Sequence, residues 1–160
     1  MVRCAYYAPW DQTLVELVPD VDLPRLEVRS AALAQASTRF VLTQPARRGA
    51  LGAGAGDGEG EGEGHGVDIR SRVFAHPLGI DEDPVTGAAH TALAVFWLDR
   101  GPEARARLGF SPAGGEGERR LRARQVSRRG GEMEVVLDRA GERVELRGSG
   151  RRVMRGVLEL

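Results

Sequence analysis

A run of acids, a proline, a threonine and small residues stands near the middle of the chain, DEDPVTGA at residues 81–88. Asp83 before Pro84 suits a helix N-cap followed by proline at the first helical position, and Thr86 is a second possible N-cap. The small Gly87 and Ala88 would leave the N–H groups of the first helical turn accessible. Because these N–H groups and the helix dipole attract negative charge, the run predicts a site for a carboxylate or a phosphate.

The same pattern also begins ordinary buried helices, so a purely structural interpretation stands beside the functional one. The three consecutive acids at residues 81–83 would be stabilised by the positive end of the helix dipole. Neighbouring carboxylates also raise one another's proton affinity. We expect two of the three to face solvent.

Two elements must position this run. The residues that follow it as far as Leu98 are apolar on every side, which predicts a central helix buried all round. Residues 69–75 before it alternate apolar and polar, so they predict a strand. One face of that strand carries Ile69, Ser71, Val73 and Ala75, and the other carries Arg70, Arg72 and Phe74.

The rest of the chain supplies further strands. Periodicity and turn residues predict strands at 13–18, 38–43, 119–127, 132–138, 143–147 and 152–160, a short amphipathic helix at 25–35, and a loop at 101–118 with at most one helical turn. Strands before and after one buried helix predict an α+β domain, with a strongly curved, mostly antiparallel sheet wrapped around the central helix. We expect residues 1–160 to form a single domain.

Residues 46–66 are dominated by glycine and acids, and we interpret them as a disordered surface insertion within that domain. A phosphate-binding glycine loop is the alternative. It would need the GxxxxGK[ST] pattern, and the chain contains no lysine. His65 within this tract is expected to be solvated.

Composition and charge argue against several classes of function. The 160 residues carry no net charge, but residues 1–99 hold 8 arginines against 14 acids, and the remainder holds 15 against 9. The arginines of the basic half alternate with acids and apolar residues in strand-like runs, so we expect solvated faces and no nucleic-acid partner. Cys4 is the one cysteine and no two histidines have HxxxH spacing, so we expect no disulfide, no metal and no cofactor. Without an apolar run of membrane-spanning length or a signal sequence, the expected location is cytoplasmic.

Two blocks of the chain resemble a known family. SRVFAHPLGIDEDPVTGAAHTALAVFW (residues 71–97) is similar to the signature of the PhzF-like phenazine-biosynthesis family, and RQVSRRGGEMEVVLDRAGERVELRGSGRRVMRGVLEL (124–160) is similar to its closing hairpins. The resemblance implies one half of a diaminopimelate epimerase-like fold, in which two such domains enclose a cleft. This chain matches the second domain only. The first domain of the family supplies the general base, and no GNP or GHP segment of that kind is found here.

The resemblance also implies roles for residues. Asp83 would be catalytic, binding or shuttling protons for a small carboxylate-bearing substrate, and the backbone of Thr86, Gly87 and Ala88 would bind the substrate carboxylate. Many members have serine where this chain has Ala88. In the second block, Gln125, Ser127, Arg128 and Gly130 lie in a run that matches the pattern QxSxRGG. We expect a structural role for these residues, with substrate binding by Arg128 as the alternative.

Two functions follow from the resemblance. The first is a cofactor-independent, proton-shifting isomerase domain acting on a small carboxylate-bearing metabolite, and it would need an N-terminal domain or a second copy to complete the cleft. A two-fold homodimer would set Asp83 of one copy against Asp83 of the other and would lack the family's base. The alternative is a non-catalytic small-anion-binding or remnant domain.

Overall fold

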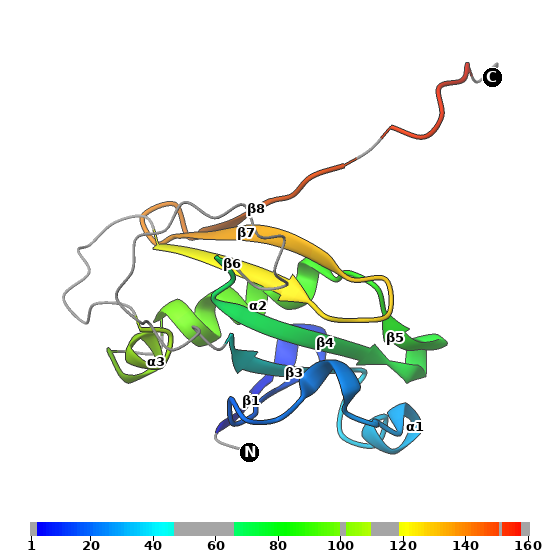
Figure 1. Cartoon of the computed structure of the whole chain (residues 1–160), viewed down its shortest axis with the longest axis horizontal. Helices are drawn as coiled ribbons and strands as arrows, with labels where there is room; N and C mark the ends of the chain where they lie inside the picture. Colours follow the sequence, from blue (N-terminus) through cyan, green and yellow to red (C-terminus); the bar gives the residue numbers. More distant parts are fainter. Residues whose placement is uncertain (1–2, 47–65, 100–101, 110–118, 151, 158–160) are drawn as a thin grey trace, which may run out of the picture.

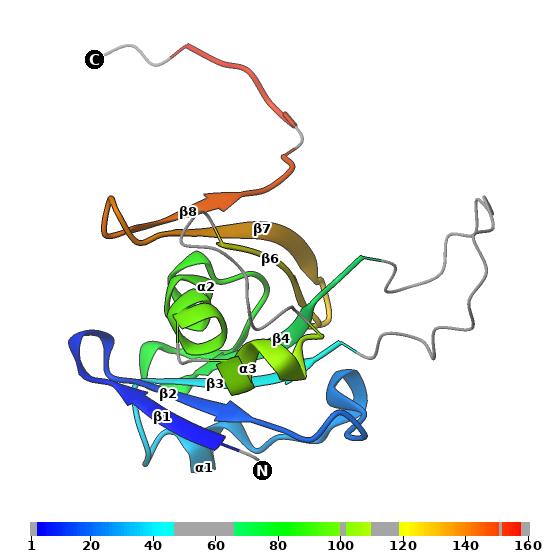
Figure 2. The same cartoon turned by 90° about the vertical axis from the view of Figure 1, so that its left-hand side faces the viewer.

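The computed structural model describes residues 3–46, 66–99, 102–109, 119–150 and 152–157. In these residues an eight-stranded sheet curls around one helix, α2 (Figures 1 and 2). The strands are β1 (Arg3–Tyr7), β2 (Gln12–Glu16), β3 (Arg39–Pro45), β4 (Ile69–Ala75), β5 (Ile80–Asp83), β6 (Arg119–Gln125), β7 (Gly131–Asp138) and β8 (Arg143–Arg147). The helices are α1 (Ser30–Leu33), α2 (Gly87–Ala94), which continues as a π-helical turn over Val95–Asp99, and α3 (Pro102–Arg107).

The strands follow the order β1-β2-β3-β4-β6-β7-β8, and β5 pairs with β4. Only the β2–β3 and β4–β6 pairs are parallel among these described strands; the other five are antiparallel. Figure 2 shows the two ends of the sheet, β1–β2 and β7–β8, lying on opposite sides of α2. The predicted α+β fold, a curved and mostly antiparallel sheet around a central helix, is therefore confirmed.

The main core lies between α2 and the inner face of the sheet. Leu14, Val41 and Val73 form one row across β2, β3 and β4, and Leu93, Phe96 and Trp97 of the helical segment are buried against the same core. One strip of the helix departs from the prediction of burial all round: Ala88 is exposed and Val95 is 41% exposed. The strip is left open because the sheet curls only part of the way around α2 (Figure 2).

A second, smaller core lies on the outer face of the sheet. Val15, Leu42 and Phe74 pack there beneath the segment between β2 and β3, which contributes the fully buried Leu23. The helix predicted over residues 25–35 is wrong for most of that range, since only Ser30–Leu33 is α-helical. Arg72 gives the physical reason, because its Nη1 donates to the carbonyls of Leu23 and Leu26 and holds that stretch as a 3₁₀ turn followed by extended chain.

Other boundaries also differ from the prediction. β1 was not predicted, and it pairs antiparallel with β2 through a turn in which Asp11 has φ of 44°. Residues 80–83, for which no strand was predicted, form β5, because Ile80 and Asp83 pair with β4. The segment 101–118 contains the six-residue α3, and residues 110–118 lie outside the described residues.

The chain beyond β8 is not the strand predicted for residues 152–160. Residues 152–157 are exposed, have no strand pairing and extend away from the sheet (Figure 1), and 158–160 lie outside the described residues. Val153 is 89% exposed and Val157 is 93% exposed. A strand requires a neighbour for its backbone hydrogen bonds, and the described sheet does not reach this segment.

Most of the predicted insertion, residues 47–65, also lies outside the described residues. Its two ends are described. Ala46 is buried and its N–H donates to the carbonyl of Asp68 at 2.9 Å, and Gly66 lies in a turn. No helix in the described part of the chain has the length and apolar character needed to cross a membrane.

Candidate functional site

The helix α2 begins at Gly87, and Thr86 is its N-cap residue with an extended backbone (φ −117°, ψ 100°). Of the two predicted N-caps, the structure therefore selects Thr86, and Pro84 precedes the helix. Among the described residues, no side chain hydrogen-bonds to the N–H groups of the first turn. Those N–H groups at Gly87 and Ala88 keep the capacity to bind an anion.

Asp83 lies beside this helix start as the last residue of β5, and it is half-buried. Its backbone position is set by pairing with Val73 of β4. Its Oδ2 accepts a hydrogen bond from the Thr86 hydroxyl. The N-cap hydroxyl therefore orients the Asp83 carboxylate and leaves Oδ1 without a hydrogen-bond partner among the described residues.

Gln125, at the end of β6, connects Asp83 at the end of β5 with Thr86 at the start of α2. This fully buried side chain accepts the Thr86 N–H at Oε1 (2.8 Å) and donates from Nε2 to the Asp83 carbonyl and to Thr86 Oγ1 (3.3 Å). Since the Thr86 N–H is engaged by Gln125, the N–H groups of Gly87 and Ala88 are the ones still available to a ligand.

His90 fixes the same loop from inside the core. Its Nδ1 lies 2.7 Å from the Thr86 carbonyl and its Nε2 lies 3.1 Å from Ser71 Oγ. Because a carbonyl can only accept, Nδ1 carries the proton and Nε2 accepts the Ser71 hydroxyl. Complete burial disfavours the charged ring and lowers the pKa of His90 below its ordinary value. His90 is thus a neutral structural bridge between β4 and the helix start.

The turn between β6 and β7 holds the loop before the helix. Ser127 Oγ donates to the Pro84 carbonyl (2.7 Å) and accepts the N–H of Gly130 (3.0 Å), whose φ is 68°. At Gly131, a Cβ would lie 2.5 Å from Val85 Cγ2, so any larger residue would force Val85 to shift. These contacts and those of Gln125 confirm the structural role expected for Gln125, Ser127 and Gly130.

Arg128 stands apart from the start of α2. Its side chain is exposed in the β6–β7 turn and lines a cleft of about 500 Å³ with Glu82 and Pro84. The alternative role for Arg128, binding a substrate carboxylate, stays a prediction.

The three acids have separate partners, which differs from the expectation that two would only face solvent. Glu82 is held by Arg72 through two hydrogen bonds of 2.7 and 2.9 Å. Asp81 is exposed but accepts from His76 Nδ1 (2.7 Å) and Ser30 Oγ (2.8 Å), and these two hydrogen bonds hold the pKa of Asp81 below its ordinary value. The expected mutual increase in proton affinity is therefore wrong for Asp81, because local donors outweigh its neighbours.

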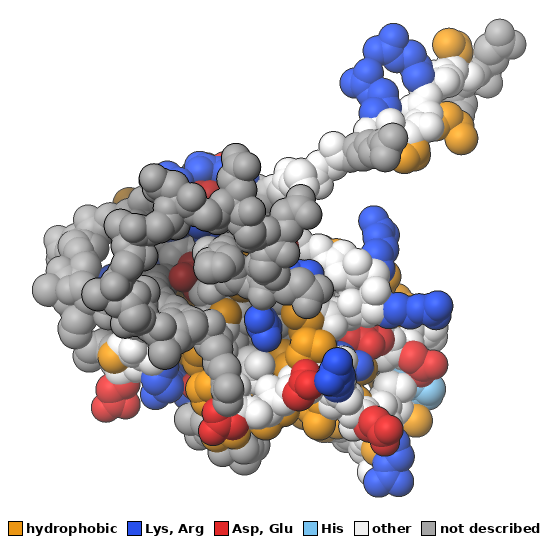
Figure 3. Space-filling model, viewed as in Figure 1, with side chains coloured by type: hydrophobic (Ala, Val, Ile, Leu, Met, Phe, Trp, Pro, Cys, Tyr) orange, Lys and Arg blue, Asp and Glu red, His pale blue; other side chains and the backbone are white. Residues whose placement is uncertain are grey.

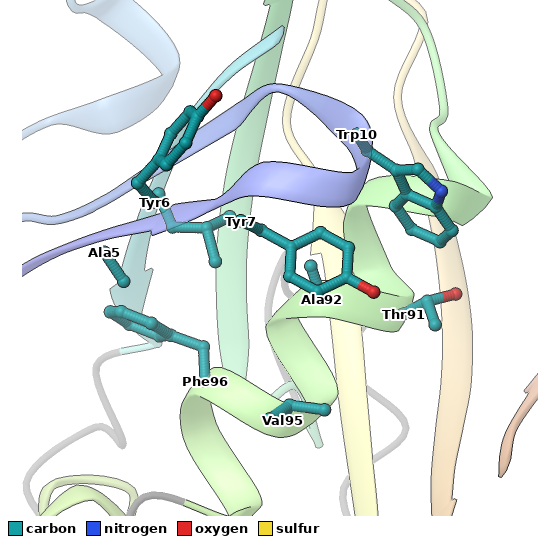
Figure 4. A pocket seen from close by; sticks show the side chains of 9 residues that line it. Ala5, Tyr6, Tyr7, Trp10, Thr91, Ala92, Val95 and Phe96 are labelled. Atoms are coloured by element: carbon teal, nitrogen blue, oxygen red, sulfur yellow. The ribbon is translucent and has the colours of Figure 1, made fainter. Parts of the chain in front are cut away.

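The open strip of α2 borders an apolar cavity of about 100 Å³ (Figure 4). Tyr7 and Trp10, whose rings meet edge to face at 5.3 Å, line it from the β1–β2 connection, and Thr91 and Val95 line it from the helix. Sequence reasoning assigned no role to these N-terminal aromatics. It also missed His90 and the contact of Gln125 with Thr86, although both residues lie in the two motif blocks.

In the described ranges, no three His, Cys, Asp or Glu side chains are grouped so as to hold a metal ion. The site therefore offers the N–H groups of Gly87 and Ala88 as hydrogen-bond donors and the oriented carboxylate of Asp83. Gln125 and His90 hold the loop that carries them.

Comparisons with known proteins agree with this architecture. The sequence model of the family PhzC-PhzF, described as phenazine biosynthesis-like protein, matches residues 24–156. A phenazine biosynthesis-like domain-containing protein of Rattus norvegicus is 37% identical over 91 residues, which cover 57% of this chain and 26% of that protein. An uncharacterised isomerase of Pseudomonas aeruginosa is 39% identical over 93 residues, covering 58% of this chain and 29% of the relative.

Solved structures show the same fold. A PhzF-family phenazine biosynthesis protein of Enterococcus faecalis superposes with a TM-score of 0.60 at 22% identity, covering 93% of this chain and 45% of the other. The chain thus spans under a third of these curated relatives and about half of the solved chain. With its family pattern matched from residue 24 to residue 156, the chain belongs to the phenazine biosynthesis-like (PhzC-PhzF) protein family.

Proposed function

We propose that this chain is one half of a cofactor-independent isomerase that shifts a proton on a small carboxylate-bearing metabolite. The observation that carries the proposal is the uncapped start of α2 beside Asp83, in a loop fixed by Gln125 and His90. Family membership and the isomerase names of two Pseudomonas aeruginosa relatives support the reaction class.

The site's chemistry follows from its donors. The substrate carboxylate accepts hydrogen bonds from the N–H groups of Gly87 and Ala88, at the positive end of the helix dipole. Asp83 then lies next to the bound molecule. With Oδ2 occupied by the Thr86 hydroxyl, Oδ1 is the atom that would take up or return the proton.

A proton shift needs a group that removes a proton at one position and a group that delivers one at another. Asp83 supplies at most one of them, so the proposal includes a second domain facing the start of α2. That domain is either an N-terminal half or a second copy of this chain. A symmetric dimer would present only a second Asp83, so the N-terminal half fits catalysis better.

Small-anion binding without turnover is the second candidate function. Ala88 favours it, because the serine that the family resemblance implies at this position would add a hydroxyl donor to the substrate carboxylate. A hydrogen bond to a charged group contributes about 1.5–3 kcal/mol, so its loss weakens binding without removing the two backbone donors.

The binding step can be tested with benzoate, followed by NMR shifts of the protein. We expect Gly87→Val to abolish binding. The new Cβ would lie 3.2 Å from Leu146 Cδ1, and because that side chain is 38% exposed it can move and preserve the fold. Gly150→Val is the matched control, since no atom lies within 4 Å of a Cβ there. Equal benzoate affinity in the Gly87→Val variant and the control would refute the site.

The reaction can be tested separately by incubating the protein with 2-cyclohexene-1-carboxylate in D₂O. Deuterium incorporation that is lost in Asp83→Asn would support the isomerase half, because a single carboxylate can exchange a substrate proton with D₂O even where the second group needed for the full shift is missing. Benzoate binding without any deuterium incorporation would favour the anion-binding domain, and sedimentation velocity on the same sample would show whether a second copy is present.

A further inference from the structure

A second cleft, of about 370 Å³, lies at the β6–β7 turn and is lined by four arginines: Arg70, Arg124, Arg128 and Arg129. Pro24 and Val126 give it apolar walls, and no carboxylate is among its lining residues. Figure 3 views the outer face of the sheet and shows blue side chains over β4 and around the β6–β7 turn. The cleft shares Gln125 and Ser127 with the frame that holds the start of α2, but Asp83, Thr86, Gly87 and Ala88 are not among its lining residues.

Strand register places two of the arginines side by side. Arg70 of β4 pairs in parallel register with Arg124 of β6, while the next residues along, Ser71 and Gln125, pair on the inner face. Because side chains alternate along a strand, Arg70 and Arg124 point to the outer face. The other two arginines occupy a turn whose shape is fixed by the hydrogen bonds of Ser127.

Three of the four arginines in this cleft have no charged partner among the described residues. Arg70 is half-buried, yet neither it nor Arg128 or Arg129 forms an ion pair or a side-chain hydrogen bond with any described residue. Arg124 lies 3.6 Å from a Glu132 oxygen. Arg72, on the same face of β4, is bound by Glu82 at 2.7 Å, so the lack of partners at Arg70 is specific to the cleft.

We propose that this cleft binds the polyphosphate group of a small molecule. A half-buried guanidinium gains from a charged acceptor, and its fork matches phosphate oxygens in bidentate geometry. The three arginines without a charged partner, Arg70, Arg128 and Arg129, carry more positive charge than a ligand with a single carboxylate could neutralise. The cleft has the volume of a small-molecule site. Its lining includes no aromatic ring on which a base of single-stranded nucleic acid would stack, which favours a free polyphosphate over RNA.

The test is calorimetric titration of the full chain with sodium tripolyphosphate, with ATP as a second ligand. We expect Arg128→Gln combined with Arg129→Gln to weaken binding at least about tenfold, the loss of charge-assisted hydrogen bonds. Arg152→Gln with Arg155→Gln is the charge-matched control in the exposed tail, and it should change the affinity less than about twofold. Gly87→Val should leave tripolyphosphate binding intact, which separates this cleft from the site at α2.

Three results would overturn the proposal. The first is absence of tripolyphosphate binding at low salt. The second is an equal loss of tripolyphosphate affinity in the cleft double variant and in the tail double variant, which would mean that net charge alone attracts the ligand. The third is much tighter binding of a uridine oligonucleotide than of tripolyphosphate, which would identify an RNA surface. Arg70→Gln adds a check inside the cleft, because it should also weaken binding and lies on a different strand from the turn.

Discussion

The contribution of Gln125 to the site can be measured by replacing it with methionine, which keeps the volume and removes the amide. The Thr86 N–H and the Asp83 carbonyl would then lose their side-chain partner. Leaving a buried polar group unsatisfied costs about 1–3 kcal/mol. Since Thr86 and Asp83 are half-buried, each group should cost only the lower part of this range, about 1–2 kcal/mol. We therefore expect Gln125→Met to lower the free energy of unfolding by about 2–4 kcal/mol, the sum for the two groups.

The chain contains a matched control for this experiment. Gln12 is also fully buried, but neither its Oε1 nor its Nε2 has a hydrogen-bond partner among the described residues. Gln12→Met removes the same chemical group without breaking a hydrogen bond, so it should be close to neutral or stabilising.

Urea unfolding, followed by circular dichroism, measures both variants. Benzoate titration adds a functional readout, because a loosened Thr86 would misplace the N–H groups of Gly87 and Ala88. Gln125→Met should therefore weaken benzoate binding while Gln12→Met does not. Equal stabilities and equal benzoate affinities for the two variants would refute the role assigned to Gln125.

Three further perturbations test other parts of the fold. Burial lowers the pKa of His90 in the folded protein, so on acidification the unfolded chain binds a proton before the folded protein does. The free energy of unfolding should therefore fall as the pH drops below about 6.5, the ordinary pKa of histidine. In His90→Asn, the urea midpoint should depend less on pH between about pH 7 and about pH 5. Glu16 is 1% exposed and binds Arg3 (2.8 Å) and Arg107 (3.0 Å), so Glu16→Gln should lower the free energy of unfolding by about 2–3 kcal/mol. Glu145 is exposed and binds Arg147 at the surface, so Glu145→Gln should leave the free energy of unfolding almost unchanged. Deleting residues 51–64 should shift Tm by less than about 2 °C, because Ala46 and Asp68 already meet through a hydrogen bond; a large drop in Tm would show that the tract packs.

Local sequence patterns determined the elements whose residues carry their own periodicity. Strands 69–75 and 143–147 were predicted with the bounds that the structure has, because alternation or turn residues mark both ends. The apolar run to Leu98 predicted the central helix, and the small residues after Thr86 predicted an accessible helix start. These features depend on neighbours in the chain, which sequence displays directly.

The tertiary structure decided what depends on distant partners. Thr86 became the N-cap because Gln125, 39 residues away, holds its N–H, and residues 80–83 became a strand because β4 offered an edge. The predicted helix at 25–35 gave way to the carbonyl contacts of Arg72, 46 and 49 residues away. Each of these outcomes depends on hydrogen bonds between segments that are distant in the sequence and that folding brings together. No local pattern specifies the partner of a buried polar group.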